Sequence, residues 1–512
     1  MKKLWKKLLA VTTAVMMAIT LLPAMANANA TDGKGSVTII KNGEKSDEFL
    51  AGAKFSFYKI ASITNSEGKD WKYTVETAYQ EKLGDNGAAK NLNNLPSSAW
   101  EAKIDVLAAV NATAIKESEA SAEKTGSTGA TELPLGVYLV KETTTPAGYV
   151  ASKPFIVSVP STDNYDTAGK EGTEFIYNIT AKPKNSKMSV DKTIVNEDKT
   201  AYIGGFVEYK VETQIPKYGT EYTNPVFNIY DKMSNGLSFV NDTAHKLKVV
   251  VGGTEIVEGE NTYTLATNGL SDGKTFAIQF AKAFLENKEN KGKKVEVTYY
   301  AQVNENAVYI NENSANITYQ NKPGETTDAT PSKKNVYTYG IDLTKTGDKS
   351  ADADGLDGAE FTLAAANGEM ISILVNGKKV AVNGESKGGF QTTTVEKENK
   401  NKKGKLVFKG LKAGTYTLTE TKSPSGYSLA KNPITIVITA KEDGSLADAT
   451  VDGISVKNNM TEDGVVPVGL QNKSGFNLPA TGGMGTYLFT IGGLVIMAGA
   501  ALLLIASKKR RA

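Results

Sequence analysis

The sequence predicts an all-β fold made of tandem β-sandwich domains. From Gly35 onward, short runs rich in Val, Ile, Thr, Tyr and Phe alternate with polar residues and are separated by Gly, Asn and Asp turns. This pattern is typical of sandwiches built from antiparallel sheets. About 450 residues lie between the two processed ends described below, which is enough for roughly three domains. The chain has no cysteine, so disulfides do not hold these domains together.

Residues 1–30 have the pattern of a secretory signal peptide. Four lysines precede an apolar stretch at 8–22, and Ala28-Asn29-Ala30 gives a small-residue cleavage site. The formal net charge is +3, and without these four lysines and the four cations of the C-terminal tail the exported part carries −5. A mildly acidic product disfavours nucleic acids and anionic membranes as partners.

The expected first domain covers residues 31–185. Alternating apolar residues predict strands at 36–40, 54–60, 136–141 and 155–159. One helix interrupts the strands. Ser98 and Glu101 have the spacing of a capping box, and apolar residues follow at helical spacing before Gly126.

Two further domains are expected at 186–335 and 336–477. The second begins with a strand-like run at 188–194, and the third with a similar run at 339–345. Residues 322–336 are polar and contain two prolines, so we predict a linker there.

Residues 478–512 combine a pentapeptide, an apolar span and a basic tail. The span at 487–506 makes a helix of about 30 Å, long enough to cross a hydrocarbon core. This order resembles the cell-wall sorting signal of Gram-positive surface proteins, in which a sortase cysteine cuts between Thr481 and Gly482. The alternative is an ordinary single-span anchor, which lacks the pentapeptide. The pentapeptide consists of Leu478, Pro479, Ala480, Thr481 and Gly482.

The chain has almost no residues that could carry out histidine or cysteine chemistry. His245 is the one histidine and lies in a polar stretch, where we expect a solvated loop residue. Zinc sites of the usual kinds and Ser-His or Cys-His catalysis are therefore disfavoured, and we expect no metal and no cofactor. The motifs GxSxG and HExxH are also absent, which argues against a wall-anchored hydrolase.

One segment occurs twice. Residues 138–149, YLVKETTTPAGY, are matched by residues 416–427, YTLTETKSPSGY. In each copy a glutamate, Glu142 or Glu420, shares a strand face with apolar neighbours. A carboxylate that faces a core is costly unless it is protonated or paired. The alternative is a sheet-edge glutamate that accepts bonds from turn amides, but two copies at matching places favour a dedicated role.

These segments resemble the E-box of sortase-assembled pilins, and the resemblance extends over the mature chain. The family is the backbone, or shaft, pilins of Gram-positive bacteria. It implies tandem immunoglobulin-like domains of the collagen-adhesin B type, many with an internal Lys–Asn isopeptide bond, here with one helix inserted in the first domain. The lysine attacks as a neutral amine, and a buried acid polarises the asparagine carboxamide and moves protons as ammonia leaves.

The resemblance implies one lysine, one acid and one asparagine in each domain. In the third domain Asn458 and Asn459 compete with the preferred asparagine because they also end a strand-like run. The alternative for every set is a lysine that pairs with a carboxylate at a sandwich edge. The implied sets are Lys41, Glu142 and Asn185; Lys192, Asp231 and Asn321; and Lys345, Glu420 and Asn472.

The segment that ends the first domain resembles the pilin motif, whose lysine attacks the sortase-bound threonine of the next subunit. Lys184 follows Pro183, and proline keeps the chain extended and clear of sheet pairing. The motif departs from the family pattern at Lys182, where a tyrosine is usual. Lys184 is the best candidate, with Lys182 and Lys187 as rivals.

The function implied is that of a major structural subunit of a covalent surface pilus, a fimbria that supports adhesion and colonisation. Sortase would link Thr481 of one subunit to Lys184 of the next. The expected partners are a pilin-specific sortase, identical subunits, accessory pilins and peptidoglycan through a housekeeping sortase, with the membrane as a partner of the precursor only. We expect this protein not to be an enzyme with turnover, because the internal bonds would form once, by autocatalysis. The alternative is a wall-anchored adhesin or minor pilin, which would not need the acceptor lysine.

Overall fold

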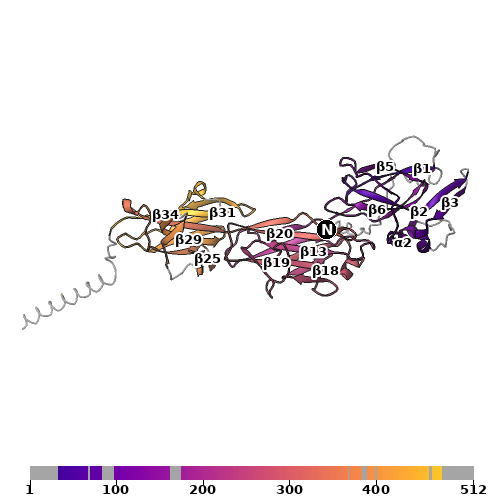
Figure 1. The fold of residues 1–512 in the computed structure, drawn as a ribbon. Helices are drawn as coiled ribbons and strands as arrows, with labels where there is room; N and C mark the ends of the chain where they lie inside the picture. Colours follow the sequence, from indigo (N-terminus) through magenta and orange to yellow (C-terminus); the bar gives the residue numbers. More distant parts are fainter. Residues whose placement is uncertain are drawn as a thin grey trace, which may run out of the picture.

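The protein is described by a computed structural model, and its strands form separate parts that follow one another in a row (Figure 1). We call them the N-terminal part (33–187), the middle part (188–337) and the C-terminal part (338–475). The predicted signal peptide lies outside the described residues, as does the predicted sorting signal except Met497. No helix among the residues described is long and apolar enough to cross a membrane. The described residues are 33–66, 70–83, 97–161, 175–366, 368, 370–382, 389–397, 400–460, 464–475 and 497.

The N-terminal part is a sandwich of two sheets, with strand orders β5-β1-β9 and β3-β2-β6-β8, and β4 beside β2. Buried residues from both sheets form one core, among them Val37, Phe55 and Val140. All four strands predicted here are confirmed, and β7 pairs with β10 outside the two sheets. The strands are β1 Lys34–Ile40, β2 Lys54–Ser66, β3 Asp70–Val75, β4 Lys116–Glu117, β5 Ser127–Pro134, β6 Gly136–Thr144, β7 Tyr149–Val150, β8 Phe155–Val159, β9 Asn178–Ala181 and β10 Ser186–Lys187.

Two helices cover a second apolar cluster in this part. Helix α2, Ser97–Ala108, confirms the predicted helix, while α1, Thr77–Leu83, was not predicted. Tyr79 of α1 and Leu107 of α2 are both buried against residues of β2 and β6. The helices therefore cover apolar surface that β2 and β6 present outside the sandwich core.

The middle part is a sandwich of two larger sheets, ordered β11-β12-β19-β15-β16 and β17-β18-β13-β20-β21, with β14 beside β19 and β22 beside β20. Its core combines buried residues of both sheets, such as Tyr209, Ile229 and Ile317. The elements are β11 Asp191–Ile194, β12 Phe206–Gln214, β13 Phe227–Met233, β14 Leu237–Val240, β15 Lys248–Val251, β16 Thr254–Ile256, β17 Tyr263–Ala266, β18 Phe276–Phe280, α3 Lys282–Glu286, β19 Lys294–Val303, β20 Ile310–Lys322, β21 Glu325–Asp328 and β22 Ser332–Tyr337.

The linker predicted at 322–336 is wrong. These residues form β21 and β22, which both pair with β20 in antiparallel register. Their prolines fall outside these strands, in the turn at Pro323 and just before β22 at Pro331, so they do not interrupt the pairing. The middle part therefore continues to Tyr337.

The C-terminal part is a third sandwich, with sheets ordered β26-β25-β29-β23-β34 and β27-β24-β30-β31-β32-β33, and β28 beside β29. Two short 3-10 helices accompany the strands at Ser350–Asp352 and Lys457–Asn459. The strands are β23 Tyr339–Gly347, β24 Glu360–Ala365, β25 Ile371–Val375, β26 Lys378–Val382, β27 Phe390–Gln391, β28 Thr393–Lys397, β29 Lys400–Leu411, β30 Gly414–Lys422, β31 Ile434–Ala440, β32 Leu446–Val451, β33 Ile454–Ser455 and β34 Val465–Asn472.

The sequence predicts antiparallel sheets, but two of the sheets also contain a parallel pair of strands. β1 pairs with β9 and β23 pairs with β34 in parallel register. β9 and β34 each follow a strand of the other sheet and return beside the first strand of their part. This return places late residues of the N-terminal and C-terminal parts next to the opening of the same part.

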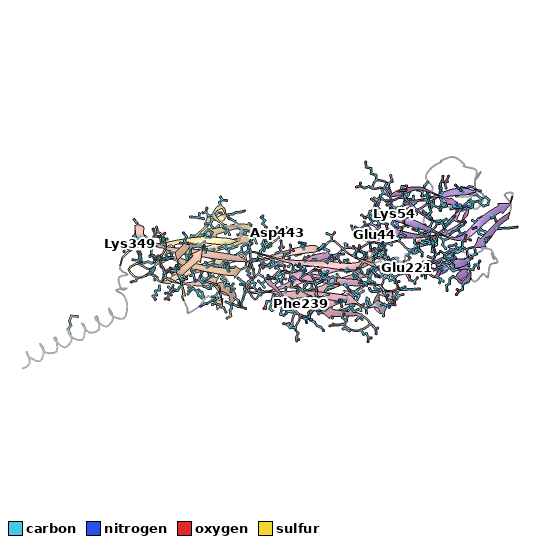
Figure 2. All side chains as sticks on the ribbon, in the orientation of Figure 1. Glu44, Lys54, Glu221, Phe239, Lys349 and Asp443 are labelled. Carbon is cyan, nitrogen blue, oxygen red and sulfur yellow. The ribbon has the colours of Figure 1, made fainter. Side chains whose placement is uncertain are left out.

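Backbone and side-chain contacts join the three parts. Between the N-terminal and middle parts, the amide of Ala151 donates to the carbonyl of Asn321 at 2.9 Å. Between the middle and C-terminal parts, the Tyr309 hydroxyl accepts a bond from the Leu446 amide, and its ring lies 5.7 Å from that of Tyr339. Figure 2 shows side chains along the whole row of parts.

Candidate functional site

Three lysines are completely buried, one in each part. Lys41 directly follows β1, Lys192 lies on β11 and Lys345 lies on β23, so each belongs to the opening of its part. Burial lowers the pKa of all three ammonium groups, and that of Lys345 to about 8. A lowered pKa makes the neutral, nucleophilic amine accessible.

In the N-terminal part the structure brings together the three predicted residues. Glu142 Oε2 lies 3.0 Å from Lys41 Nζ, although the pair lacks hydrogen-bond geometry. Glu142 Oε1 accepts a hydrogen bond from Asn185 Nδ2 at 2.9 Å. The amide and hydroxyl of Ser152 donate to Oε2 at 2.8 and 2.9 Å. The carboxyl group therefore bridges the amine and the carboxamide.

The C-terminal part holds a similar arrangement. Asn472 Nδ2 donates to both oxygens of Glu420 at 2.9 Å, and the Ala430 amide donates to Oε2 at 2.7 Å. Lys345 Nζ donates to the carbonyls of its neighbour Thr346 at 3.0 Å and of Leu470 at 3.3 Å.

Parallel pairing of β23 with β34 brings the backbone of Asn472 near that of Lys345. Lys345 is opposite Leu470, two residues before Asn472. The rival residues Asn458 and Asn459 are exposed in a 3-10 helix and do not belong to this set.

In the middle part the lysine and the acid meet as predicted. Lys192 Nζ lies 2.5 Å from Asp231 Oδ2. Asp231 is buried because it alternates in phase with Phe227 and Ile229 along β13. Burial raises the pKa of the Asp231 carboxyl group, against the attraction of Lys192.

Asn321, predicted to complete the middle set, does not lie in it. Its side-chain oxygen accepts a bond from the following amide, and its carbonyl bonds to the N-terminal part. The asparagine present in the set is Asn313, earlier on β20, which is fully buried. Asn313 Nδ2 donates to the Tyr299 hydroxyl at 3.2 Å, and that hydroxyl contacts both Lys192 Nζ and Asp231 Oδ2.

Sequence reasoning missed Asn313 and Tyr299, yet a signal for Asn313 exists. On β20, Asn313 alternates in phase with the buried residues Ala315, Ile317 and Tyr319, which marks it as core-facing. An asparagine in the buried phase of a strand needs polar partners. The sequence offers no comparable signal for Tyr299, because many tyrosines occupy buried strand positions.

The candidate acceptor Lys184 is exposed. It lies between Pro183 and the buried Asn185. The side chain of Lys184 is therefore open to solvent, while that of Asn185 is enclosed in the N-terminal part. The backbone here is held beside Asn42, whose carbonyl accepts a bond from the Asn185 amide. Of the two rivals, Lys182 is half-buried and Lys187 is exposed on β10.

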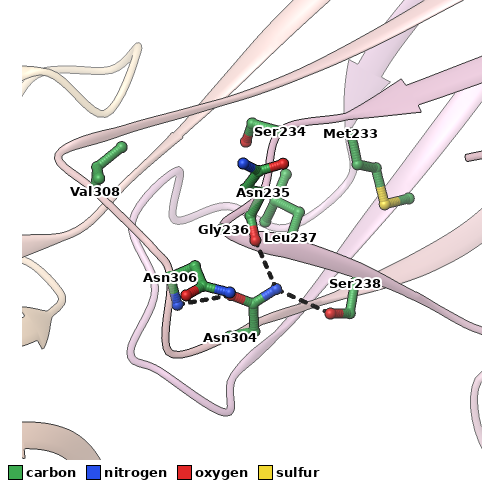
Figure 3. Close-up of a pocket in the computed structure, with 9 residues that line it drawn as sticks. All are labelled: Met233, Ser234, Asn235, Gly236, Leu237, Ser238, Asn304, Asn306 and Val308. Carbon is green, nitrogen blue, oxygen red and sulfur yellow. Dashed lines mark hydrogen bonds between the residues drawn. The ribbon is translucent and has the colours of Figure 1, made fainter. Parts of the chain in front are cut away.

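A separate pocket of about 700 Å³ opens on the middle part. Figure 3 shows Asn304 among its lining residues, donating to Ser238 and to the carbonyl of Asn235. None of its lining residues is charged, and none belongs to the three lysine sets. They are Met233, Ser234, Asn235, Gly236, Leu237, Ser238, Asn304, Asn306 and Val308.

Family models match most of the chain. A prealbumin-like fold domain matches residues 35–173 and again 340–452, and the Cna-B-like domain of the Gram-positive pilin backbone subunit 2 matches 203–323. The LPXTG cell wall anchor motif matches 471–512. The repeated prealbumin-like match covers both E-box copies.

Known relatives and solved structures agree with these models. Fimbrial subunit type 2 of Actinomyces naeslundii is 28% identical over 490 residues, covering 89% of this chain and 82% of that protein. Fimbrial subunit type 1 of Actinomyces viscosus is 26% identical over 469 residues, covering 82% of this chain and 83% of that protein. The T6 backbone pilin of Streptococcus pyogenes has the same fold at a TM-score of 0.56, with 19% identity over 87% of this chain and 99% of that one. The chain belongs to the backbone pilins of Gram-positive bacteria.

Proposed function

We propose that this protein forms the shaft of a covalent surface pilus in which Thr481 of one subunit is joined to Lys184 of the next. The observation that carries the proposal is the exposure of Lys184 beside the buried Asn185. A shaft subunit needs a reachable acceptor amine as well as a sorting threonine, whereas a wall-anchored adhesin needs only the threonine.

The linkage proceeds in two steps. A pilin-specific sortase breaks the bond between Thr481 and Gly482 and holds the threonine as an acyl group on its cysteine. Lys184 Nζ of the next subunit then attacks this acyl group, and the cysteine leaves as a thiol. The last subunit passes instead to peptidoglycan through a housekeeping sortase, and accessory pilins join by the same chemistry.

Within each part, we propose a bond between the buried lysine and the buried asparagine. The lysine Nζ attacks Cγ of the asparagine, the bond from Cγ to Nδ2 breaks, and ammonia leaves. The acid accepts a proton from Nζ and returns one to Nδ2, so no external reactant is needed. The bonds are Lys41 to Asn185, Lys192 to Asn313, and Lys345 to Asn472.

The three parts are proposed to be domains that each close on themselves in this way. We keep the first boundary near residue 185 and move the second from 335 to 337, because β22 pairs with β20. Each bond then joins the opening of a domain to a residue in its last quarter.

The test of the shaft function is an immunoblot of wall extracts from cells that express Lys184→Ala, Lys182→Ala or Lys187→Ala. We expect a high-mass ladder from the unmutated protein and from the last two variants, but only monomer from Lys184→Ala. A ladder that persists in Lys184→Ala would overturn the acceptor site. The absence of any ladder from the unmutated protein would favour a minor pilin or adhesin.

A further inference from the structure

The hydroxyl group of Tyr299 lies at the centre of the middle set. Tyr299 is on β19, and its side chain is completely buried. The hydroxyl donates to Asp231 Oδ2, contacts Lys192 Nζ, and accepts a hydrogen bond from Asn313 Nδ2 at 3.2 Å. It is therefore in contact with the nucleophile, the acid and the leaving group of the proposed reaction.

The other two sets have no such intermediary. Glu142 and Glu420 each accept a hydrogen bond directly from the asparagine Nδ2, at 2.9 Å. Asp231 has one methylene fewer than a glutamate, and the bond that Asn313 Nδ2 donates goes to Tyr299 instead. The tyrosine hydroxyl occupies the place between acid and amide that the longer side chain spans elsewhere.

We propose that Tyr299 is a catalytic residue of the middle domain, whose hydroxyl passes a proton between Asp231 and Asn313 during isopeptide formation. This proposal rests on the proposed bond between Lys192 and Asn313. It assigns the tyrosine a role in the reaction itself, beyond packing against the lysine.

The proton balance of the step is complete within these four side chains. Lys192 Nζ forms a bond to Cγ of Asn313 and gives one proton to Asp231 Oδ2. Asp231 passes a proton to the Tyr299 oxygen, while the original hydroxyl proton moves to Nδ2 of Asn313 after rotation about the C–O bond. The bond from Cγ to Nδ2 then breaks, ammonia leaves, and both Asp231 and Tyr299 return to their starting states.

The surroundings of the hydroxyl group suit this role. Burial and the nearby Asp231 raise the pKa of Tyr299 well above its usual value, so the phenol keeps its proton at neutral pH. The ring of Tyr209 lies 4.7 Å from Lys192 Nζ, and that of Tyr299 lies 5.0 Å away, which shields the amine from water. Proton transfer in such a site has no competing solvent path.

The experiment compares bond formation in the full chain carrying Tyr299→Phe or Tyr319→Phe. Tyr319 is an equally buried tyrosine on β20 of the opposite sheet, and its hydroxyl makes no hydrogen bond to the described residues of the set. After a pulse of cell-free synthesis, peptide mapping by mass spectrometry follows the fraction of each Lys–Asn link with time. We expect Tyr299→Phe to slow the Lys192–Asn313 link by about 10²–10⁴-fold. The other two links, and all links in Tyr319→Phe, should form at the unmutated rate.

The outcomes separate the two proposals. A Tyr299→Phe chain that closes the middle link as fast as the unmutated chain overturns the relay and leaves the bond standing. An unmutated chain without the Lys192–Asn313 link overturns the bond and, with it, the relay.

Replacement of Tyr299 by 3-fluorotyrosine covers the case in which the phenylalanine variant does not fold. This residue keeps the hydroxyl and its hydrogen bonds but makes the phenol more acidic. If the proton travels through the hydroxyl, the rate of the middle link alone should change. An unchanged rate would show that the hydroxyl has only a structural role.

Discussion

The outer domains and the middle domain assemble the same three functional groups in different ways. In the outer domains a glutamate near the end of β6 or β30 binds the asparagine directly, and an amide ten residues later fixes the carboxyl group. In the middle domain a shorter acid, Asp231 on β13, reaches its asparagine through Tyr299. The buried lysine at the opening of the domain is the element that all three share.

If the proposed reaction occurs in all three parts, it tolerates an acid of different length on a different strand, while the lysine keeps its place at the opening of each part. The position of the asparagine also differs: Asn185 lies between β9 and β10, Asn472 ends β34, and Asn313 lies in the first part of β20. The proposed reaction therefore requires a buried amine, a buried acid and a carboxamide close together, whichever strands supply them.

The largest expected effect is mechanical. Tension that enters at Lys184 and leaves at Thr481 crosses the middle and C-terminal domains and bypasses the N-terminal domain. Pulling between these positions should therefore give no unfolding step of domain size, because each loaded domain is closed by a covalent bond. Lys192→Ala or Lys345→Ala should each restore one step in single-molecule force spectroscopy.

Lys41→Ala is the matched control for this experiment. It removes the corresponding lysine from the domain that the load bypasses, so its force trace should equal that of the unmutated chain. Full domain unfolding in the unmutated chain would contradict the covalent closure.

The next effect is on thermodynamic stability. Glu420→Gln should prevent the bond between Lys345 and Asn472, so that the chain loses one ammonia fewer, relative to the mass of its own sequence, than the unmutated chain does. By analogy with a disulfide that closes a loop of roughly 100 residues, the loss should be about 5 kcal/mol in the free energy of unfolding. Denaturant unfolding measures it, with the exposed Glu442→Gln as control. A Glu420→Gln chain that still forms the bond would show that another group acts as the acid.

A smaller effect distinguishes the two outer domains from each other. The Ser152 hydroxyl donates to Glu142, whereas Ala430, ten residues after Glu420, supplies only its amide. Ser152→Ala should therefore slow the N-terminal link by about tenfold, the equivalent of about 1.5 kcal/mol, without abolishing it. Peptide mapping over time would check this, and complete loss of the link would contradict the equivalence of the two domains.

The last expected effect is a pH dependence in a chain that lacks the C-terminal bond. In Asn472→Ala, burial holds the pKa of folded Lys345 at about 8, below the value near 10.4 of the unfolded chain. Between these two pKa values the unfolded state binds more protons than the folded state, so the free energy of unfolding rises with pH. This gain is lost as the pH falls through 8. The stability of Asn472→Ala relative to the double variant with Lys345→Met should therefore increase from pH 8 to pH 10. A constant difference would contradict the lowered pKa.

The sequence revealed the outer sites because the repeat that contains Glu142 and Glu420 marks their acids directly. Asp231 could also be predicted, since its strand pattern is clear. The resemblance implied Asn321 because family members place this asparagine on the final strand, whereas the asparagine beside Tyr299 is Asn313, earlier on β20. The strands at 325–328 and 332–337 were missed because their residues are mostly polar and half-exposed. Tyr299 could not be predicted, because its role depends on three strands that meet only in the folded chain.

The most direct test of the account is to identify which asparagine is joined to Lys192 in the exported protein. Peptide mapping by tandem mass spectrometry should find Lys192 linked to Asn313, together with Lys41 to Asn185 and Lys345 to Asn472, and a total loss of three ammonia molecules. A link from Lys192 to Asn321, or an intact mass without any loss of ammonia, would contradict it.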